Sequence, residues 1–482
     1  MSVRRSMAWM LASQGGLFFL QFGGSVALAR LLTPYEMGVY AIAAAMIGII
    51  GIVQSFGLTL FVIREAQASH AMIASAFTMN IVLSTLLSAG IVGLSLFGGA
   101  FLDEPGVRNV MLVLAVIPLI GVFEFRPITM LERSAEFRAI AGLNVLRAIA
   151  STAVTVVLAF MGHSYMSIAW GAVAGSVTGT TGAMILGRRH VSFRLGIAAW
   201  RDVLRFGMQQ LAINGINGVA GRLSEFMLGR LLGLEALGLW GRAGNLNNLL
   251  WLNIHGVIAR VMMVTLAEQR RAGLSLRPVY LRTVEVLTAV LWPSFAGLAI
   301  LAGPFISIVY GSAWVAAAPP LAALAVAAIV LVSLTMTWEV FIVCNETGRQ
   351  ARFEMVRTGV GLILFVGACL VSLTSAAVAR VAEALFSVLL YRSHTERMTD
   401  TRWPDYVPIY RRSAMVTAAA CAPAVVLMTA FHWSAAVPAS FVALAVGVGV
   451  VLWLIALKLL DHPLSEEIGR FVHKGRQVVG LT

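Results

Sequence analysis

Five arginines lie inside long apolar stretches of the sequence, where a charged side chain is costly and marks a candidate functional position. A guanidinium donates two parallel hydrogen bonds and keeps its charge away from water, so its chemistry suits a phosphate group. Amide side chains both donate and accept hydrogen bonds, which suits sugar hydroxyls. The five arginines are Arg147, Arg222, Arg242, Arg260 and Arg380.

Two neighbouring apolar segments combine both kinds of side chain. Arg242 and Arg260 are 18 residues apart, so on a helix they share one face, about 27 Å apart along its axis. Asn253 shares that face, and Asn245 lies within about 60° of it. The preceding segment carries a second polar stripe at helical steps, made of Gln210, Asn214, Asn217, Gly221 and Glu225. We expect the two stripes to line a wet cavity because lipid satisfies no polar group; alternatively, the amides form hydrogen bonds that hold helices together.

The other arginines divide into one isolated residue and two members of pairs. Arg147 stands about ten residues into its apolar stretch, with no carboxylate near it in the sequence, and is therefore the leading cavity candidate of the first half. Arg222 with Glu225, and Arg380 with Glu383, have the i,i+3 spacing that lets opposite charges pair on one helix face. Structural pairing and a role in binding both remain open for these two arginines.

The composition places these residues in a membrane protein. Of the 482 residues, 59% are hydrophobic and only 12% are charged, and the mean hydropathy is +0.87. Fourteen apolar stretches are long enough to cross roughly 30 Å of hydrocarbon, which predicts an all-α polytopic membrane protein with about 14 transmembrane helices. These stretches lie near 7–29, 37–62, 72–101, 108–125, 137–161, 165–187, 205–231, 236–266, 279–309, 315–343, 354–373, 375–391, 413–431 and 436–457.

The net charge of +13 follows the predicted topology. With the N-terminus inside, 27 of the 35 basic residues fall in inside segments, five fall within the spans, and three fall outside. The outside residues are Arg30, Arg108 and Arg230. This asymmetry is the positive-inside rule and predicts that both termini are cytoplasmic. The basic charge therefore indicates topology and contact with anionic membrane lipids rather than nucleic-acid binding.

An internal repeat organises the spans. The stretch "LARLLTPYEMGVY" at 28–40 returns as "LGRLLGLEALGLW" at 228–240, with Leu, Arg, Leu, Leu and Gly in matching places 200 residues apart. Six predicted spans separate the copies, so the two halves have the same orientation and form two parallel six-helix bundles. The predicted parts are an N-terminal bundle at 1–190, a cytoplasmic linker at 191–204, a C-terminal bundle at 205–400, two additional helices at 401–460 and a cytoplasmic tail at 461–482.

Within the first copy of the repeat, Thr33 is predicted to be the N-cap of the second helix, Pro34 its first residue and Glu36 the partner in a capping box. In the second copy Gly233 and Leu234 replace Thr-Pro. The arginine of this stretch, Arg30 or Arg230, lies at a helix end where it can reach the interface, which predicts a scaffold role.

No catalytic constellation is visible in the sequence. His163, His255 and His432 are scattered singly, and neither a phosphate-binding loop nor a paired-carboxylate spacing occurs. The three cysteines are widely spaced and form no metal or disulfide pattern. The outside connections are only a few residues long. We therefore expect no enzyme, no metal and no cofactor.

Three stretches carry a family resemblance: "LARLLTPYEMGVYAIAAAM" after the first span, "MLERSAEFR" at 130–138 and "PFISIVYGSAWVAAAPPLAALA" at 304–325. They resemble the Wzx-type polysaccharide flippases, in the polysaccharide transporter branch of the multidrug/oligosaccharidyl-lipid/polysaccharide exporter superfamily. The resemblance implies a V-shaped, pseudo-twofold pair of bundles in the bacterial plasma membrane. It also implies alternating access, moving an undecaprenyl-pyrophosphate-linked oligosaccharide of an O-antigen, capsule or exopolysaccharide from the inner to the outer leaflet. The polymerase and chain-length regulator of the same export pathway are the implied partners.

Three alternatives stay open at this stage. One is a peptidoglycan-precursor flippase, and a second is a cation-coupled multidrug exporter of the same superfamily. The exporter is expected to carry a carboxylate within its first helices, where this chain has only Glu36 and Glu65 at their ends. A membrane polysaccharide polymerase or glycosyltransferase is the alternative of another class, which the short outside connections disfavour.

The source of energy is also open. Glu225 and Glu383 are candidate coupling carboxylates for H⁺ or Na⁺, and the membrane potential is the other candidate. If the flippase interpretation holds, we expect Arg147, Arg242 and Arg260 to bind the pyrophosphate at successive stages.

Overall fold

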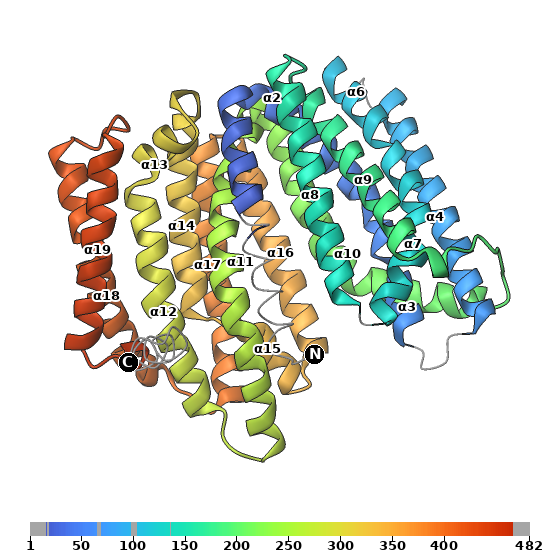
Figure 1. Ribbon diagram of the computed structural model, residues 1–482. Coiled ribbons are helices and arrows are strands. Elements are labelled where there is room, and N and C mark those ends of the chain that lie inside the picture. The colour runs from blue at the N-terminus through green and yellow to red at the C-terminus, as the bar shows by residue number, and fades with distance from the viewer. Residues whose placement is uncertain (1–15, 17–18, 65–68, 98–103, 135, 466–482) are drawn as a thin grey trace, which may run out of the picture. The chain divides into compact units, whose positions relative to one another are not determined.

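The computed structural model describes residue 16 and residues 19–64, 69–97, 104–134 and 136–465, apart from the side chains of residues 55, 190, 212–217, 253, 254 and 256–261. Within this part of the chain the regular structure is all helical (Figure 1). Nine of the described helices or helix runs are long and apolar enough to cross a membrane. The predicted class, an all-α polytopic membrane protein, is confirmed.

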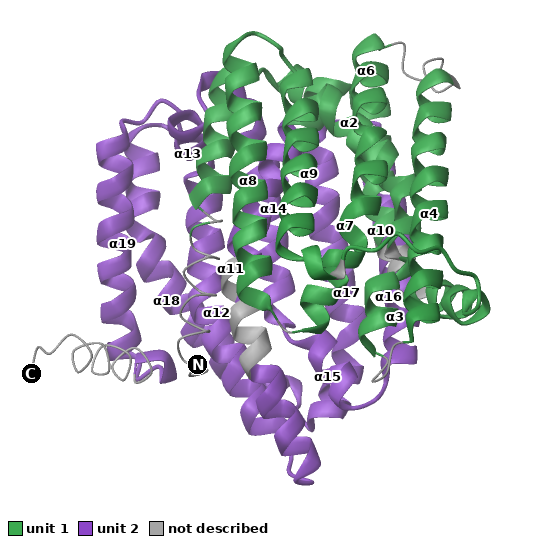
Figure 2. Ribbon diagram, turned by 45° about the vertical axis from the view of Figure 1, so that its right-hand side comes forward, with its two compact units in different colours: residues 1–238 green, residues 239–482 purple. Residues whose placement is uncertain are grey.

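The chain divides into two compact units, residues 1–238 and residues 239–482 (Figure 2). In the first unit residues 19–31 are helical. They are followed by α2 (Pro34–Gly51), η1 (Ile52–Phe56), α3 (Leu58–Arg64), α4 (His70–Phe97), α6 (Pro105–Leu114), α7 (Val116–Arg133), α8 (Phe137–Phe160), α9 (Met166–Leu186), η2 (Arg188–His190) and α10 (Trp200–Leu232).

The second unit contains most of α11 (Leu234–Arg271), which begins just before the unit boundary. The elements that follow are α12 (Arg277–Ile300), α13 (Ala302–Val309), η3 (Ser312–Ala317), α14 (Ala318–Ser333), α15 (Thr337–Val343), α16 (Thr347–Cys369), α17 (Leu373–Thr399), α18 (Trp403–Ala430) and α19 (Ala439–Leu459). Packing therefore groups α10 with the first unit, whereas the repeat assigns it to the second bundle. The domain bounds drawn from the repeat stay predictions.

Several helices extend beyond the apolar stretches that predict them. The helix α7 continues through Pro127 to Arg133, and α16 begins at Thr347, seven residues before the predicted span. The helices α10 and α11 have 33 and 38 residues, or about 50 and 57 Å, well beyond the hydrocarbon thickness. Long arginine side chains reach water from such extensions. Arg133, which lies beyond the predicted span 108–125, is therefore helical.

The two copies of the repeated motif pack on each other inside the first unit. A Cβ atom on Gly38 would overlap the carbonyl oxygen of Leu234, and a Cβ atom on Gly238 would overlap the carbonyl oxygen of Pro34. These contacts are reciprocal, because 34 corresponds to 234 and 38 to 238. Only glycine allows two helix backbones to approach so closely. The duplicated glycine thus has a direct structural reason.

The turns that precede these two helices use different chemistry. Before α2, the predicted capping box is confirmed: the Thr33 amide donates to Glu36 Oε2 at 2.7 Å, and the Glu36 amide donates to Thr33 Oγ1 at 3.3 Å. Before α11, Gly233 has a φ of 89°, a conformation that favours glycine. Both devices let a new helix start directly after the preceding one.

The helix is broken between α14 and α15, inside the candidate membrane span Ser312–Val343. Backbone groups at such a break lack the hydrogen bonds of a continuous helix. Met336 has a φ of 61°, which interrupts the helical ladder. The Tyr410 hydroxyl donates to the carbonyl oxygen of Ser333 at 2.5 Å, and the Tyr280 hydroxyl donates to that of Thr335 at 3.0 Å. Non-helical backbone is tolerated at membrane depth only when protein satisfies it, and these two tyrosines do so.

The segment between η2 and α10 is extended and fixed to the first unit. The Arg126 guanidinium donates to the carbonyl oxygen of Ser192 at 3.1 Å, and the Gly196 amide donates to Thr78 Oγ1 at 3.0 Å. The Phe193 ring lies 6.0 Å from Phe77 and 5.8 Å from that of Phe123, measured between centroids. Part of the predicted linker, 200–204, belongs to α10.

We predict that Gly38→Ala destabilises the protein by about 1–3 kcal/mol, because the added methyl group overpacks a backbone contact. Thermal unfolding of the detergent-purified protein measures the effect. Gly241→Ala on α11 is the matched control, since a Cβ atom there meets nothing within 4 Å. Equal unfolding temperatures for the two variants would contradict the close-approach role of Gly38.

Candidate functional site

Arg147 does not stand alone, contrary to the sequence-based expectation. Its Nη2 forms an ion pair with Glu124 Oε1 on α7, 23 residues earlier in the chain. The Thr180 hydroxyl on α9 donates to Glu124 Oε2 at 3.3 Å. The side chains of Arg147 and Glu124 are 37% and 17% exposed. The carboxylate neutralises the arginine because a bare charge inside a bilayer is costly.

Glycines of α9 make room for this arginine. A Cβ atom on Gly179 would overlap the Arg147 guanidinium, and one on Gly175 would lie 2.9 Å from Ser151 Cβ. These glycines belong to two overlapping GxxxG spacings, which allow close helix packing. Because these glycines have no side chain, the Arg147 guanidinium can lie directly against α9.

The predicted pairing of Arg222 with Glu225 is confirmed. Arg222 Nη1 lies 3.0 Å from Glu225 Oε2 on the same face of α10, and the two side chains are 48% and 38% exposed. The guanidinium also lies against α2, where a Cβ atom on Gly48 would come within 2.6 Å of Arg222 Nε. The pair is thus formed but remains accessible.

Arg242 is buried against aromatic rings of the second unit. The residue is 5% exposed, and its Cζ lies 5.3 Å from the centroids of both Tyr310 and Trp314. Cation–π contacts of this kind stabilise a desolvated guanidinium. In this conformation Arg242 therefore packs the turn between α13 and α14 rather than lining an open cavity. Its role in binding stays a prediction.

The remaining predicted residues give less information. Asn245 lies exposed on α11. The side chains of Arg260, Asn214, Asn217 and Asn253 lie outside the described side chains, although their backbones are helical. The wet cavity expected between the two polar stripes is therefore untested.

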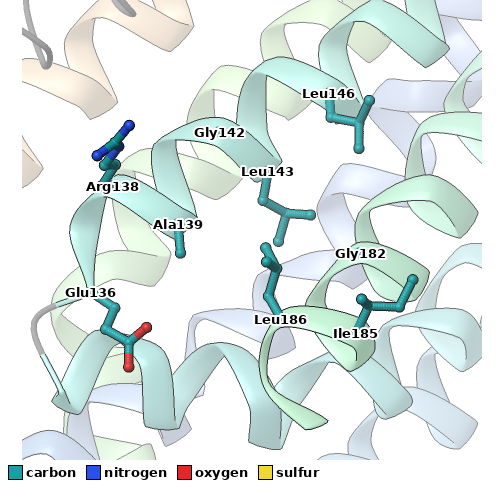
Figure 3. A pocket seen from close by; sticks show the side chains of 9 residues that line it. All are labelled: Glu136, Arg138, Ala139, Gly142, Leu143, Leu146, Gly182, Ile185 and Leu186. Carbon is teal, nitrogen blue, oxygen red and sulfur yellow. The ribbon is translucent and has the colours of Figure 1, made fainter.

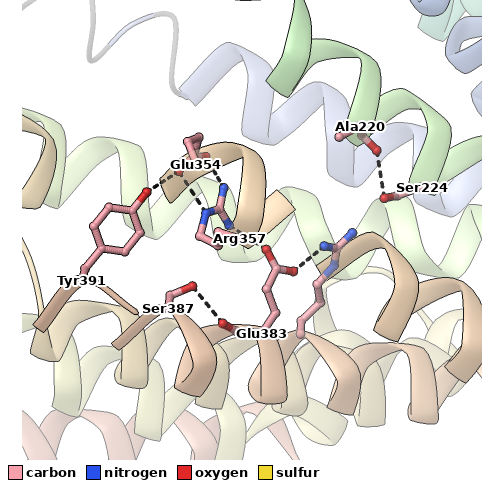
Figure 4. Close-up of polar contacts among 8 residues, drawn as sticks. Ala220, Ser224, Glu354, Arg357, Glu383, Ser387 and Tyr391 are labelled. Atoms are coloured by element: carbon pink, nitrogen blue, oxygen red, sulfur yellow. Dashed lines mark hydrogen bonds and ion pairs between the residues drawn. The ribbon is translucent and has the colours of Figure 1, made fainter. Parts of the chain in front are cut away.

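Glu383 belongs to a network of four charged side chains in the second unit (Figure 4). Arg380 Nη1 lies 2.6 Å from Glu383 Oε2, which confirms the predicted i,i+3 pair. Arg357 Nη1 on α16 lies 2.6 Å from Glu383 Oε1, so the carboxylate bridges two arginines. Arg357 also pairs with Glu354, whose Oε2 accepts a hydrogen bond from the Tyr391 hydroxyl at 2.9 Å.

Sequence reasoning missed Glu124, Glu354 and Arg357. Glu124 stands at the end of a predicted span, Glu354 at the start of another, and Arg357 three residues into that one. Two signals were available: α7 runs past Glu124 for nine more residues, and Glu354 and Arg357 have the i,i+3 spacing with which they pair on α16. The contacts Glu124–Arg147 and Arg357–Glu383 join different helices, which spacing along one helix cannot reveal.

A groove of about 650 Å³ runs along α8 and α9 in the first unit (Figure 3). Gly142 and Gly182 contribute no side chain there, and the leucines of the two helices form much of the lining. Glu136 and Arg138 belong to the first turn of α8 or precede it. The lining of the groove is therefore apolar apart from these two charged residues.

No group of three or more His, Cys, Asp or Glu side chains that could hold a metal ion occurs among the residues searched, which are the described ones. The histidine at membrane depth, His255, instead shares a hydrogen bond of 3.0 Å with Thr335 Oγ1 at the break before α15.

The arrangement of helices matches solved membrane transporters. The lipid II flippase MurJ, in an inward closed conformation, is similar with a TM-score of 0.71 and 12% identity, over 95% of this chain and 99% of that chain. An inward-facing multidrug resistance MATE family transporter of the MOP superfamily gives a TM-score of 0.62 and 13% identity, over 80% of this chain and 96% of that one. The chain therefore shares the fold of these two proteins.

The sequence comparisons define the family within that fold. Residues 27–319 match the family model described as polysaccharide biosynthesis protein, so the chain belongs to this family. It is 23% identical over 283 residues to the teichuronic acid biosynthesis protein TuaB of Bacillus subtilis (strain 168), and 21% identical over 324 residues to the succinoglycan biosynthesis transport protein ExoT of Rhizobium meliloti (strain 1021). The matches cover 58% and 67% of this chain, and 59% and 66% of these relatives.

We predict that Glu124→Gln lowers stability by about 2 kcal/mol, because it leaves the Arg147 charge uncompensated within the membrane. The double variant Arg147→Gln/Glu124→Gln is expected to recover most of this loss. Thermal unfolding of the four members of this double-mutant cycle gives the coupling. Additive effects of the two substitutions would contradict the pairing.

Proposed function

We propose that this protein is a flippase that moves an oligosaccharide repeat unit, linked to undecaprenyl pyrophosphate, from the inner to the outer leaflet of the bacterial plasma membrane. The observation that carries the proposal is that a chain of the polysaccharide biosynthesis family has the MOP transporter fold. A transporter in such a pathway must move a sugar carrier with an anionic headgroup. The transported unit belongs to an O-antigen, a capsule or an exopolysaccharide.

The membrane-embedded arginines supply the chemistry that this headgroup needs. A guanidinium binds phosphate oxygens through two parallel hydrogen bonds, and Arg147 is placed at membrane depth with a carboxylate that neutralises it in the absence of substrate. Because Arg147 is 37% exposed, an incoming phosphate can reach it. In this mechanism the phosphate replaces Glu124 as the partner of the arginine, and alternating access then exposes the site to the other leaflet.

Coupling and topology complete the proposal. Glu225 and Glu383 are the proposed coupling carboxylates, through H⁺ or Na⁺, and the membrane potential is the other proposed source of energy. Both termini are proposed to be cytoplasmic, with the polymerase and the chain-length regulator as partners. The protein is proposed to act as a transporter and to catalyse no covalent step.

One observation favours a second candidate substrate. The fold is similar to that of a lipid II flippase over nearly the whole chain, and a peptidoglycan precursor shares the pyrophosphate carrier but not the sugars. Identity of 12% carries the fold alone, so the choice between the two depends on the transport assay. The multidrug exporter and the polymerase gain no support from the arginine–carboxylate chemistry.

We predict that proteoliposomes containing the protein translocate a fluorescent undecaprenyl-pyrophosphate-linked oligosaccharide, measured by protection of the label from a membrane-impermeant quencher. Translocation is expected to fall at least tenfold in Arg147→Gln and less in Arg147→Lys, which keeps the charge but loses the bidentate geometry. Lipid II, assayed in parallel, is expected to be a poorer substrate. Absence of translocation for both lipids by the wild-type protein would overturn the proposed function.

A further inference from the structure

Each of the two units holds an arginine at a similar position along one of its helices. The helices α8 and α16 each correspond to the fifth predicted span of their six-span set. Arg147 lies ten residues after Phe137, the first residue of α8, and Arg357 lies ten residues after Thr347, the first residue of α16. Each arginine is held by a carboxylate from another helix, Glu124 for Arg147 and Glu383 for Arg357. Arg357 therefore has the same position in its helix as Arg147 has, although the two arginines are 210 residues apart and the repeated motif is offset by 200.

Arg357 lies among charged side chains. Its guanidinium bridges two carboxylates, with Nε 3.1 Å from Glu354 Oε2 and Nη1 2.6 Å from Glu383 Oε1. Arg380 contacts the other oxygen of Glu383 at 2.6 Å. Two cations and two anions thus form one connected network whose formal charge is zero.

Neighbouring residues hold this network in place. A Cβ atom on Gly361 would overlap the carboxylate of Glu383, so glycine at this position admits the carboxylate between α16 and α17. The guanidinium of Arg380 lies 4.2 Å from the centroid of the Phe365 ring, a cation–π distance. Glu383 is only 9% exposed, whereas the side chains of Arg357 and Arg380 are 28% and 24% exposed. The cations are thus more accessible than the anion between them.

Resting on the proposed function, we propose that Arg357 and Arg380 form a second anion site, which takes the pyrophosphate diester headgroup of the lipid-linked substrate by displacing Glu383. A diphosphate presents several anionic oxygens and can engage two guanidinium groups that a single carboxylate now bridges. The cost of opening the network is offset because each arginine keeps an anionic partner. Glu354 remains with Arg357 and fixes its position.

A carboxylate that loses both arginines is an uncompensated buried charge, which is the main cost of displacing Glu383. The charged or titratable groups around it are Arg357 and Glu354 on α16 and Arg380 and Tyr391 on α17. Of the other helices packed against α17, α14 has no titratable residue and α15 has Glu339.

The test is binding of a farnesyl-pyrophosphate-linked monosaccharide to the full-length protein in nanodiscs. Glu383→Gln removes the competing anion, so it is expected to bind about tenfold more tightly than the wild type. Arg357→Gln is expected to bind at least tenfold more weakly.

Two further variants make the result decisive. Arg349→Gln on the same helix is the matched control, since Arg349 pairs with Glu346, and its affinity should equal that of the wild type. Arg357→Gln/Glu383→Gln keeps the network neutral and is expected to fold even if a single variant does not; it should still lose binding. Wild-type affinity in this double variant, or unchanged affinity in Glu383→Gln, would overturn the proposal.

The same experiment separates this inference from the proposed function. If the wild type binds and translocates the lipid-linked substrate while the Arg357 and Glu383 variants bind it like the wild type, the second site is refuted and the flippase function stands. If the wild type neither binds the probe nor translocates the full substrate, both are refuted.

Discussion

The constraint on which this structure depends is that groups placed inside a bilayer must be satisfied by the protein itself. Arg147 forms an ion pair with Glu124 of another helix, and Glu383 forms ion pairs with two arginines. Between α14 and α15, where the helix is broken, two tyrosine hydroxyls donate hydrogen bonds to backbone carbonyl oxygens. Each case includes a partner from another helix, distant in the sequence, and Glu383 also has Arg380 three residues away. The polar positions are therefore also the positions that fix how the helices of each unit pack.

The same constraint explains how a charged site can exist before substrate arrives. A neutral arginine–carboxylate pair is tolerated at membrane depth, whereas a bare arginine is not. In such a pair the guanidinium is held by a carboxylate, which an anionic headgroup can replace. On this account the carboxylates are internal substitutes for the phosphate, and the glycines beside them, Gly179 and Gly361, provide the space in which the charged groups lie.

Local chemistry could be predicted from the sequence, and contacts between helices could not. The capping box of Thr33 and Glu36 and the pairs Arg222–Glu225 and Arg380–Glu383 are contacts within one turn, which spacing determines. Glu124 and Arg357 lie 23 and 26 residues from their partners, and Arg242 lies 68 residues from Tyr310. The 200-residue repeat is visible in the sequence. Its arginine is the conspicuous residue there, but in the structure its glycine makes the contact between the two copies. Hydropathy also predicts spans shorter than the helices α7 and α16, because both helices continue beyond their apolar segments.

The central claim is that arginines held by carboxylates are the groups that receive the pyrophosphate. A cryo-electron microscopy structure of the full chain in nanodiscs with an undecaprenyl-pyrophosphate-linked oligosaccharide tests it most directly. The account predicts phosphate oxygens about 3 Å from the guanidinium of Arg147 or Arg357, with Glu124 or Glu383 displaced from that arginine. A bound headgroup elsewhere, with both ion pairs intact, would contradict it.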